Sequence, residues 1–130
     1  MSLRENLKQS CLILDGPTGT ELIRKGYKAA PPLWTARAAL DQPKLLKAVH
    51  TSYLEAGVQI LTSNTFRTSS YTAAKAGLDV EEARRFTHSS VAIATEAIEE
   101  FNGKGPHFIA GSLAPLEDCY SPHLVPELAV

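Results

Sequence analysis

Three short apolar runs divide this 130-residue sequence, and each run ends abruptly in small polar residues. Continuous apolar runs of this length are typical of strands that are covered on both faces in a parallel sheet. Segments with helical spacing follow the runs, and strands that alternate with helices predict right-handed βαβ units. We therefore predict an α/β fold with parallel strands at residues 11–14, 58–62 and 107–112.

Capping residues and glycines mark the expected helices between these strands. A helical lead-in is expected at residues 1–10, a short helix at 20–25 and another at 69–76. A longer helix is expected to begin at Pro43, with Asp41 as its acidic cap, because proline is favoured in the first turn and acids at the cap.

The longest helix is predicted to begin after Asp79 and to end at Gly103. Asp79 and Glu82 have the spacing of a capping box, in which each side chain accepts a hydrogen bond from the other residue's backbone N–H. The spacing of the following apolar residues predicts one buried face. We expect that face to contain Val80, Ala83, Thr87, Val91, Ala94, Ile98 and Phe101.

Each of the three predicted strands ends in a small polar cluster, on the side where parallel α/β proteins gather their ligands. The clusters are residues 15–20, Ser63-Asn64-Thr65 and Gly111-Ser112. The first begins with Asp15, whose charge would repel a phosphate, and it matches neither GxxxxGK[ST] nor GxGxxG. A carboxylate beside backbone N–H groups suits the ammonium and carboxylate of an amino acid. On the residues alone, the alternative is that these clusters only cap helices and turns.

Composition and charge exclude several classes of protein. The hydrophobic content of 44% and the charged content of 21% are those of a globular protein. The formal net charge is -1 and no basic block is present, so we expect no nucleic-acid partner. No apolar run approaches the roughly 20 residues that span a bilayer, so we expect no membrane partner.

The cysteines and the N-terminus predict a cytoplasmic protein. Cys11 and Cys119 lie far apart and form neither a disulfide framework nor a CxxC metal site. The first residues lack the apolar core of a signal peptide. The histidines form no pair at positions i and i+4, and we interpret all four as structural or solvated. They are His50, His88, His107 and His123.

Four blocks of the sequence, in order, resemble the homocysteine S-methyltransferases. Residues 13–22 resemble the opening DGxxGTxL of that family, although Pro17 and Thr18 depart from its usual pattern. The second block is Leu33-Trp34-Thr35-Ala36, followed by Pro43, His50, Tyr53 and Ala56-Gly57. The third is Ser63-Asn64-Thr65-Phe66, and the fourth is the GSxxP-like segment 110–116.

The resemblance implies a zinc-dependent enzyme on a (β/α)8 barrel that transfers a methyl group from a donor to homocysteine thiolate, giving methionine. Zinc held by three cysteines would lower the pKa of the homocysteine thiol. Carried over residue by residue, Asp15 and Gly16 match the homocysteine-binding Asp-Gly, and Thr65 matches a threonine near the amino acid. Trp34 matches an aromatic residue that contacts the methyl donor in one branch of the family.

Neither zinc-binding cysteine motif of the family occurs in these 130 residues, and Cys11 and Cys119 match neither. A full barrel usually needs about 250 residues, so we expect residues 1–130 to form a single partial domain, the N-terminal portion of the barrel with about three strands. We expect this portion to be inactive alone and to self-associate through its open sheet edge. The alternatives are a non-catalytic amino-acid-binding module and a structural fragment.

Overall fold

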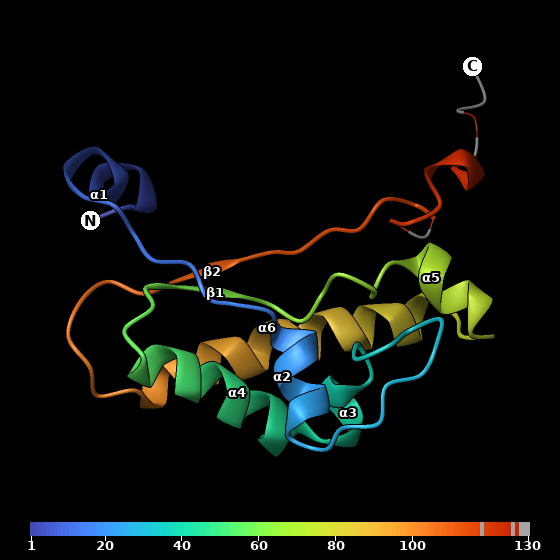
Figure 1. Cartoon of the computed structure of the whole chain (residues 1–130), viewed down its shortest axis with the longest axis horizontal. Helices are drawn as coiled ribbons and strands as arrows, with labels where there is room; N and C mark the ends of the chain where they lie inside the picture. Colours follow the sequence, from blue (N-terminus) through green and yellow to red (C-terminus); the bar gives the residue numbers. More distant parts are fainter. Residues whose placement is uncertain (118, 126, 128–130) are drawn as a thin grey trace.

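The structure is a computed structural model that describes residues 1–117, 119–125 and 127 (Figure 1). The prediction of one domain over residues 1–130 therefore extends, at 118, 126 and 128–130, outside the described residues. In chain order the elements are α1 (Leu3–Gln9), α2 (Thr18–Arg24), α3 (Ala38–Asp41), α4 (Pro43–Glu55), β1 (Ile60–Thr62), α5 (Ser70–Lys75), α6 (Val80–Glu100), β2 (Phe108–Ala110) and the 3-10 helix η1 (Pro122–Leu124).

Strands β1 and β2 pair in parallel, which confirms the predicted orientation of the sheet. The register places Ile60 opposite Phe108 and Thr62 opposite Ala110. Both strands are shorter than the predicted runs. Backbone hydrogen bonds continue one residue further at each end, from Phe108 N–H to the Gln59 carbonyl (2.8 Å) and from Ser63 N–H to the Ala110 carbonyl (2.9 Å).

The prediction of a strand covered on both faces at residues 11–14 is wrong. This segment makes one isolated parallel bridge, between Leu14 and Ile60. The Ile13 carbonyl accepts from the N–H groups of Gln59 (2.9 Å) and Ile60 (3.1 Å). However, Ile13 is 59% exposed and Leu14 is 55% exposed. The helices pack against β1 and β2 and, in the described part of the chain, leave these two side chains uncovered.

Helices α2, α3, α4 and α6 form a layer on one side of the strands, whereas α1 lies apart from it (Figure 1). Helix α4 contacts β1, and α6 contacts both α4 and β2. The layer is held by a cluster that includes Leu22 of α2, Leu46 and Val49 of α4 and Ile93 of α6. A second cluster contains Leu61, so β1 is anchored to the ends of α4 and α6. Each such fully buried side chain contributes roughly 1.5–3 kcal/mol.

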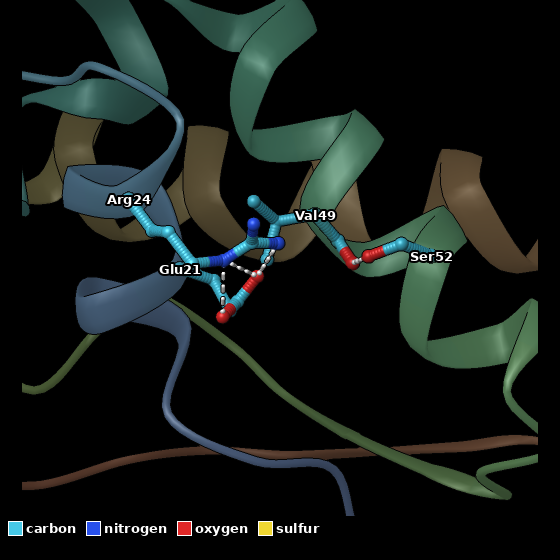
Figure 2. Close-up of polar contacts among 4 residues, drawn as sticks. All are labelled: Glu21, Arg24, Val49 and Ser52. Carbon is cyan, nitrogen blue, oxygen red and sulfur yellow. Dashed lines mark hydrogen bonds and ion pairs between the residues drawn. The ribbon is translucent and has the colours of Figure 1, made fainter.

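Helix α2 follows the first polar turn directly, and its packing fixes that turn. Figure 2 shows Arg24 donating to both carboxylate oxygens of Glu21, with the shortest distance 2.7 Å, on the side of α2 that faces Val49 of α4. In the same view the Ser52 hydroxyl donates to the Val49 carbonyl at 2.7 Å. An exposed ion pair within a helix contributes only about 0.3–0.5 kcal/mol. Burial of Leu22, rather than the ion pair, therefore holds α2 against α4.

One of the two predicted caps is confirmed and the other is wrong. The Asp79 carboxylate accepts from Glu82 N–H at 2.8 Å, and the Glu82 carboxylate accepts from Asp79 N–H at 3.0 Å, so α6 begins with a capping box. Helix α4 is instead preceded by Gln42, which makes no side-chain capping bond. Asp41 cannot cap α4 because it is the last residue of α3, and its carboxylate accepts from the Tyr27 hydroxyl at 3.3 Å.

The buried face of α6 is only partly the predicted one. Ala83 and Ala94 are buried as predicted, whereas Val80 and Val91 are exposed. Two adjacent stripes of apolar residues run along this helix. The stripe that packs against α3 and α4 is not the predicted one. Its buried residues are Ala83, Phe86, Ser90, Ile93, Ala94 and Ala97. No helix among the described residues combines the length and apolarity needed to cross a membrane.

Candidate functional site

An open pocket of about 540 Å³ lies where the polar clusters of the sequence meet. The first turn, the loop that carries Trp34, and the residues after β1 and β2 all contribute to it. The predicted convergence of the three clusters at one rim is therefore observed. The lining residues are Gly16–Thr20, Ile23, Trp34–Ala36, Thr62–Asn64, Phe66, Arg67, Ser112, Cys119 and Tyr120.

Asp15 is held at the end of β1 by Thr62. Its backbone N–H donates to the Ile60 carbonyl at 3.0 Å. Its carboxylate accepts from Thr62 N–H at 2.8 Å and from the Thr62 hydroxyl at 2.6 Å, one bond on each oxygen. A carboxylate offers about four acceptor positions, so about two remain. Asp15 itself does not line the pocket, but the next residue, Gly16, does.

Two opposing effects act on the Asp15 carboxyl. Partial burial raises its pKa, because the charged form loses hydration. The hydrogen bonds from Thr62 act in the opposite direction, because they favour the charged form. Burial dominates, so the pKa of Asp15 lies above its ordinary value.

At Gly16 the turn lies close to Tyr53 of α4. A Cβ atom at Gly16 would lie 2.8 Å from the Tyr53 hydroxyl oxygen. A Cβ atom at Gly19 would lie 3.0 Å from the Thr35 hydroxyl oxygen. The turn therefore allows close approach of α4 on one side and of the Trp34 loop on the other.

Trp34 forms one wall of the pocket from a tight loop. Its backbone has a φ of 51°, in the left-handed region, and its N–H donates to the Ala30 carbonyl at 2.7 Å. Its side chain is 45% exposed, whereas the neighbouring Leu33 is buried against Ala36 and Phe86. The loop is thus anchored beside Trp34 and leaves the indole on the pocket.

Thr65 is buried and does not line the pocket. Its hydroxyl donates to the Ser112 carbonyl at 2.9 Å and accepts from Ser112 N–H at 3.0 Å. It also shares a hydrogen bond of 2.9 Å with the Ser63 hydroxyl. These contacts use the bonding capacity of the hydroxyl and join the end of β1 to the end of β2.

Several residues that build the site carry no role in the sequence-based predictions. Thr62 is the last residue of a predicted strand, and that position could have indicated its place at the rim. Tyr53 appeared in a family-like block without a function. Phe66 and Arg67 also line the pocket, and the Arg67 guanidinium lies 5.6 Å from the centre of the Phe66 ring.

The residues present do not fit a zinc ion. In the described ranges, no three His, Cys, Asp or Glu residues lie close enough together to hold a metal. Cys11 and Cys119 are both exposed free thiols.

Comparison with known proteins points to one family. A family model described as homocysteine S-methyltransferase matches residues 12–129. Over 90 residues the chain is 40% identical to homocysteine S-methyltransferase YbgG of Bacillus subtilis, covering 69% of this chain and 29% of that protein. Over 112 residues it is 32% identical to the homocysteine S-methyltransferase of Escherichia coli, covering 83% of this chain and 36% of that protein.

A solved structure resembles this fold closely. The metallated form of the homocysteine methyltransferase MmuM from Escherichia coli superposes with a TM-score of 0.78 at 31% identity. The match covers 87% of this chain and 41% of that chain. The chain spans about a third of the length of the curated relatives that it matches.

Proposed function

This chain belongs to the homocysteine S-methyltransferase family, and we propose that it forms the part of such an enzyme that binds the amino-acid end of homocysteine. In the reaction, the thiolate sulfur of homocysteine forms a bond to the methyl carbon of a donor. The bond from that carbon to the donor breaks, its electron pair leaves with the donor, and homocysteine becomes methionine. The observation that carries the proposal is the Asp15-Gly16 turn, which opens onto a pocket lined by the polar ends of β1 and β2. Family membership favours this function over an unrelated binding module or a structural fragment.

Asp15 and Gly16 carry the proposed recognition of the amino acid. The carboxylate of Asp15 has about two acceptor positions beyond those used by Thr62, which suits the ammonium group of homocysteine. Gly16 lines the pocket next to Asp15, and its lack of a side chain leaves room for Tyr53 of α4 to pack against the turn.

Thr65 and Trp34 complete the proposed substrate site in different ways. Thr65 acts beside the amino acid by fixing Ser112, which lines the pocket. Trp34 supplies an apolar wall on the side where we place the methyl donor.

We propose that residues 1–130 are one partial domain, the N-terminal portion of a (β/α)8 barrel. The parallel pairing of β1 and β2, with helices packed on one side, supports this arrangement. Zinc is the metal implied for the whole enzyme, but the described residues do not fit it. We therefore expect the isolated chain to bind homocysteine without transferring the methyl group.

The exposed edge of the strand layer is the basis for proposed self-association. Ile13 and Leu14 are more than half exposed beside β1, and an apolar strand edge invites pairing with another chain. Sedimentation velocity should show dimers or larger species whose fraction rises with concentration. A single monomeric species across the concentration range would contradict this proposal.

A cytoplasmic location is also proposed. Cys11 and Cys119 are free and exposed, and such thiols persist in a reducing compartment. A fluorescent fusion of the protein in its own cells would test this location.

Isothermal titration calorimetry of the 130-residue chain with L-homocysteine, under reducing conditions, tests the proposed function. We expect saturable binding of homocysteine and none of inorganic phosphate, which the Asp15 carboxylate repels. Absence of homocysteine binding to a chain that is folded by circular dichroism would contradict the proposal. Binding of phosphate in place of homocysteine would contradict it as well.

A further inference from the structure

A side-chain hydrogen bond connects the Trp34 loop to the end of β1. The Asn64 side chain donates from Nδ2 to the Thr35 carbonyl at 2.8 Å. A carbonyl oxygen only accepts hydrogen bonds, so the amide nitrogen of Asn64, rather than its oxygen, must face Thr35. Asn64 is 8% exposed, which shields this bond from competition by water.

Helix α6 anchors Asn64 from the other side. The Ser90 hydroxyl donates to the Asn64 carbonyl at 3.1 Å, and Ser90 is fully buried. Helix α6 packs against α3, α4 and α5 and is the longest element of the fold. The contacts therefore run from a firmly packed helix, through Asn64, to the residue that follows Trp34.

The backbone conformation of Trp34 needs contacts that hold it in place. A left-handed conformation, with φ at 51°, is unfavourable for a tryptophan and persists only where the surrounding contacts impose it. The Ala30 carbonyl holds Trp34 N–H on one side. Asn64 holds the carbonyl of the next residue on the other side.

We propose that Asn64 is a positioning residue that holds the Trp34 indole as the wall of the pocket. Loss of its N–H donor would release the loop, move the indole and loosen the fit of the ligand. The identity of the ligand rests on the proposed function, whereas the positioning of Trp34 does not.

Trp34 is the single tryptophan of the chain, so intrinsic fluorescence reports on this wall directly. Asn64→Asp keeps the size of the side chain but replaces the N–H donor with an oxygen that repels the Thr35 carbonyl. We expect emission at longer wavelength and stronger quenching by acrylamide in the ligand-free protein. Ser90→Ala should change both in the same direction and by less. The matched control, Asn102→Asp, makes the same charge change at an exposed residue and should leave both unchanged.

Unchanged Trp34 emission and quenching in a folded Asn64→Asp chain would overturn the proposal. An equal change in Asn102→Asp would overturn it too, because the effect would then follow charge alone. If Asn64→Asp fails to fold, the side-chain amide protons of Asn64 in the unmodified chain provide the test by NMR. Slow exchange with solvent supports the bond to Thr35, and rapid exchange overturns it.

Titration with L-homocysteine separates this inference from the proposed function. If both hold, Asn64→Asp binds homocysteine about fivefold or more weakly than the unmodified chain, because release of the loop also moves Thr35, which lines the pocket beside Gly19 of the first turn. Full homocysteine affinity in Asn64→Asp would overturn the role of Asn64 in ligand fit. Absence of binding in the unmodified chain would contradict the proposed function and leave the fluorescence result as the test of positioning.

Discussion

Strand β1 and the segment of residues 11–14 have similar apolar sequences and lie side by side, yet their burial differs sharply. Leu61 in β1 is 0% exposed, whereas Leu14 is more than half exposed. β1 has a parallel partner in β2, a bridge to Leu14 and contacts with α4. Within the described ranges, the segment of residues 11–14 has only the bridge to β1 as sheet pairing. Apolar sequence alone therefore does not decide burial, which depends on the neighbours that the chain supplies.

The largest expected effect comes from shortening one leucine in each region. Leu61→Ala should lower the free energy of unfolding by about 2–5 kcal/mol, because it leaves a cavity in a packed cluster. Leu14→Ala, the matched control, should cost less than about 1 kcal/mol, because much of that side chain is already in water. Urea denaturation measures both. Equal losses would show that the exposed segment is as well packed as β1.

His50 and His88 differ in burial in the same way as Leu61 and Leu14. His50 on α4 is fully buried, and neither ring nitrogen has a hydrogen-bond partner in the described part of the chain. Burial lowers the pKa of His50 to about 4 from an ordinary value of 6.5. His88 on α6 is exposed.

The low pKa of His50 predicts acid sensitivity. Below pH 6.5 the unfolded chain takes up a proton at His50, whereas the folded chain does not until about pH 4. The free energy of unfolding should therefore fall by about 3 kcal/mol from this group as the pH drops through that window. Urea denaturation at a series of pH values tests this. His50→Leu should flatten the pH dependence and His88→Leu should not, whereas an equally steep curve in His50→Leu would refute the assignment.

A smaller effect is expected at the contact between the two regions. Thr62→Val removes the hydroxyl that donates to Asp15 and should cost about 1–2 kcal/mol. It should also raise the pKa of Asp15 further, because that hydrogen bond favours the charged form. An NMR titration of the Asp15 carboxyl carbon measures the shift. Thr62→Ser keeps the hydroxyl and should restore both properties; a Thr62→Val chain with an unshifted Asp15 would show that this bond is unimportant.

Local features were the most predictable part of the fold. Neighbouring residues determine the capping box of Asp79 and Glu82 and the polar turn after residue 14. Both features could therefore be predicted from the sequence. The buried stripe of α6 and the cover of residues 11–14 depend on distant partners, and there the predictions were wrong or partial.

In the candidate site, too, local features were predictable and contacts between distant residues were not. Residues at the three strand ends could be named in advance, because parallel strands bring their ends to one rim. The bonds of Thr62 to Asp15 and of Asn64 to Thr35 join residues 47 and 29 positions apart. No local pattern distinguishes these side chains from others of their type, so only the structure revealed them.

The central claim is that Asp15 recognises the ammonium group of homocysteine, and calorimetry of Asp15→Asn tests it most directly. Asp79→Asn is the matched control: it makes the same charge change at the start of α6, away from the Asp15-Gly16 turn, and asparagine caps a helix about as well as aspartate. We predict that homocysteine binds Asp15→Asn about 10- to 100-fold more weakly, as expected for loss of a charged hydrogen bond, and binds Asp79→Asn with unchanged affinity. Unchanged affinity in a folded Asp15→Asn chain would contradict the account.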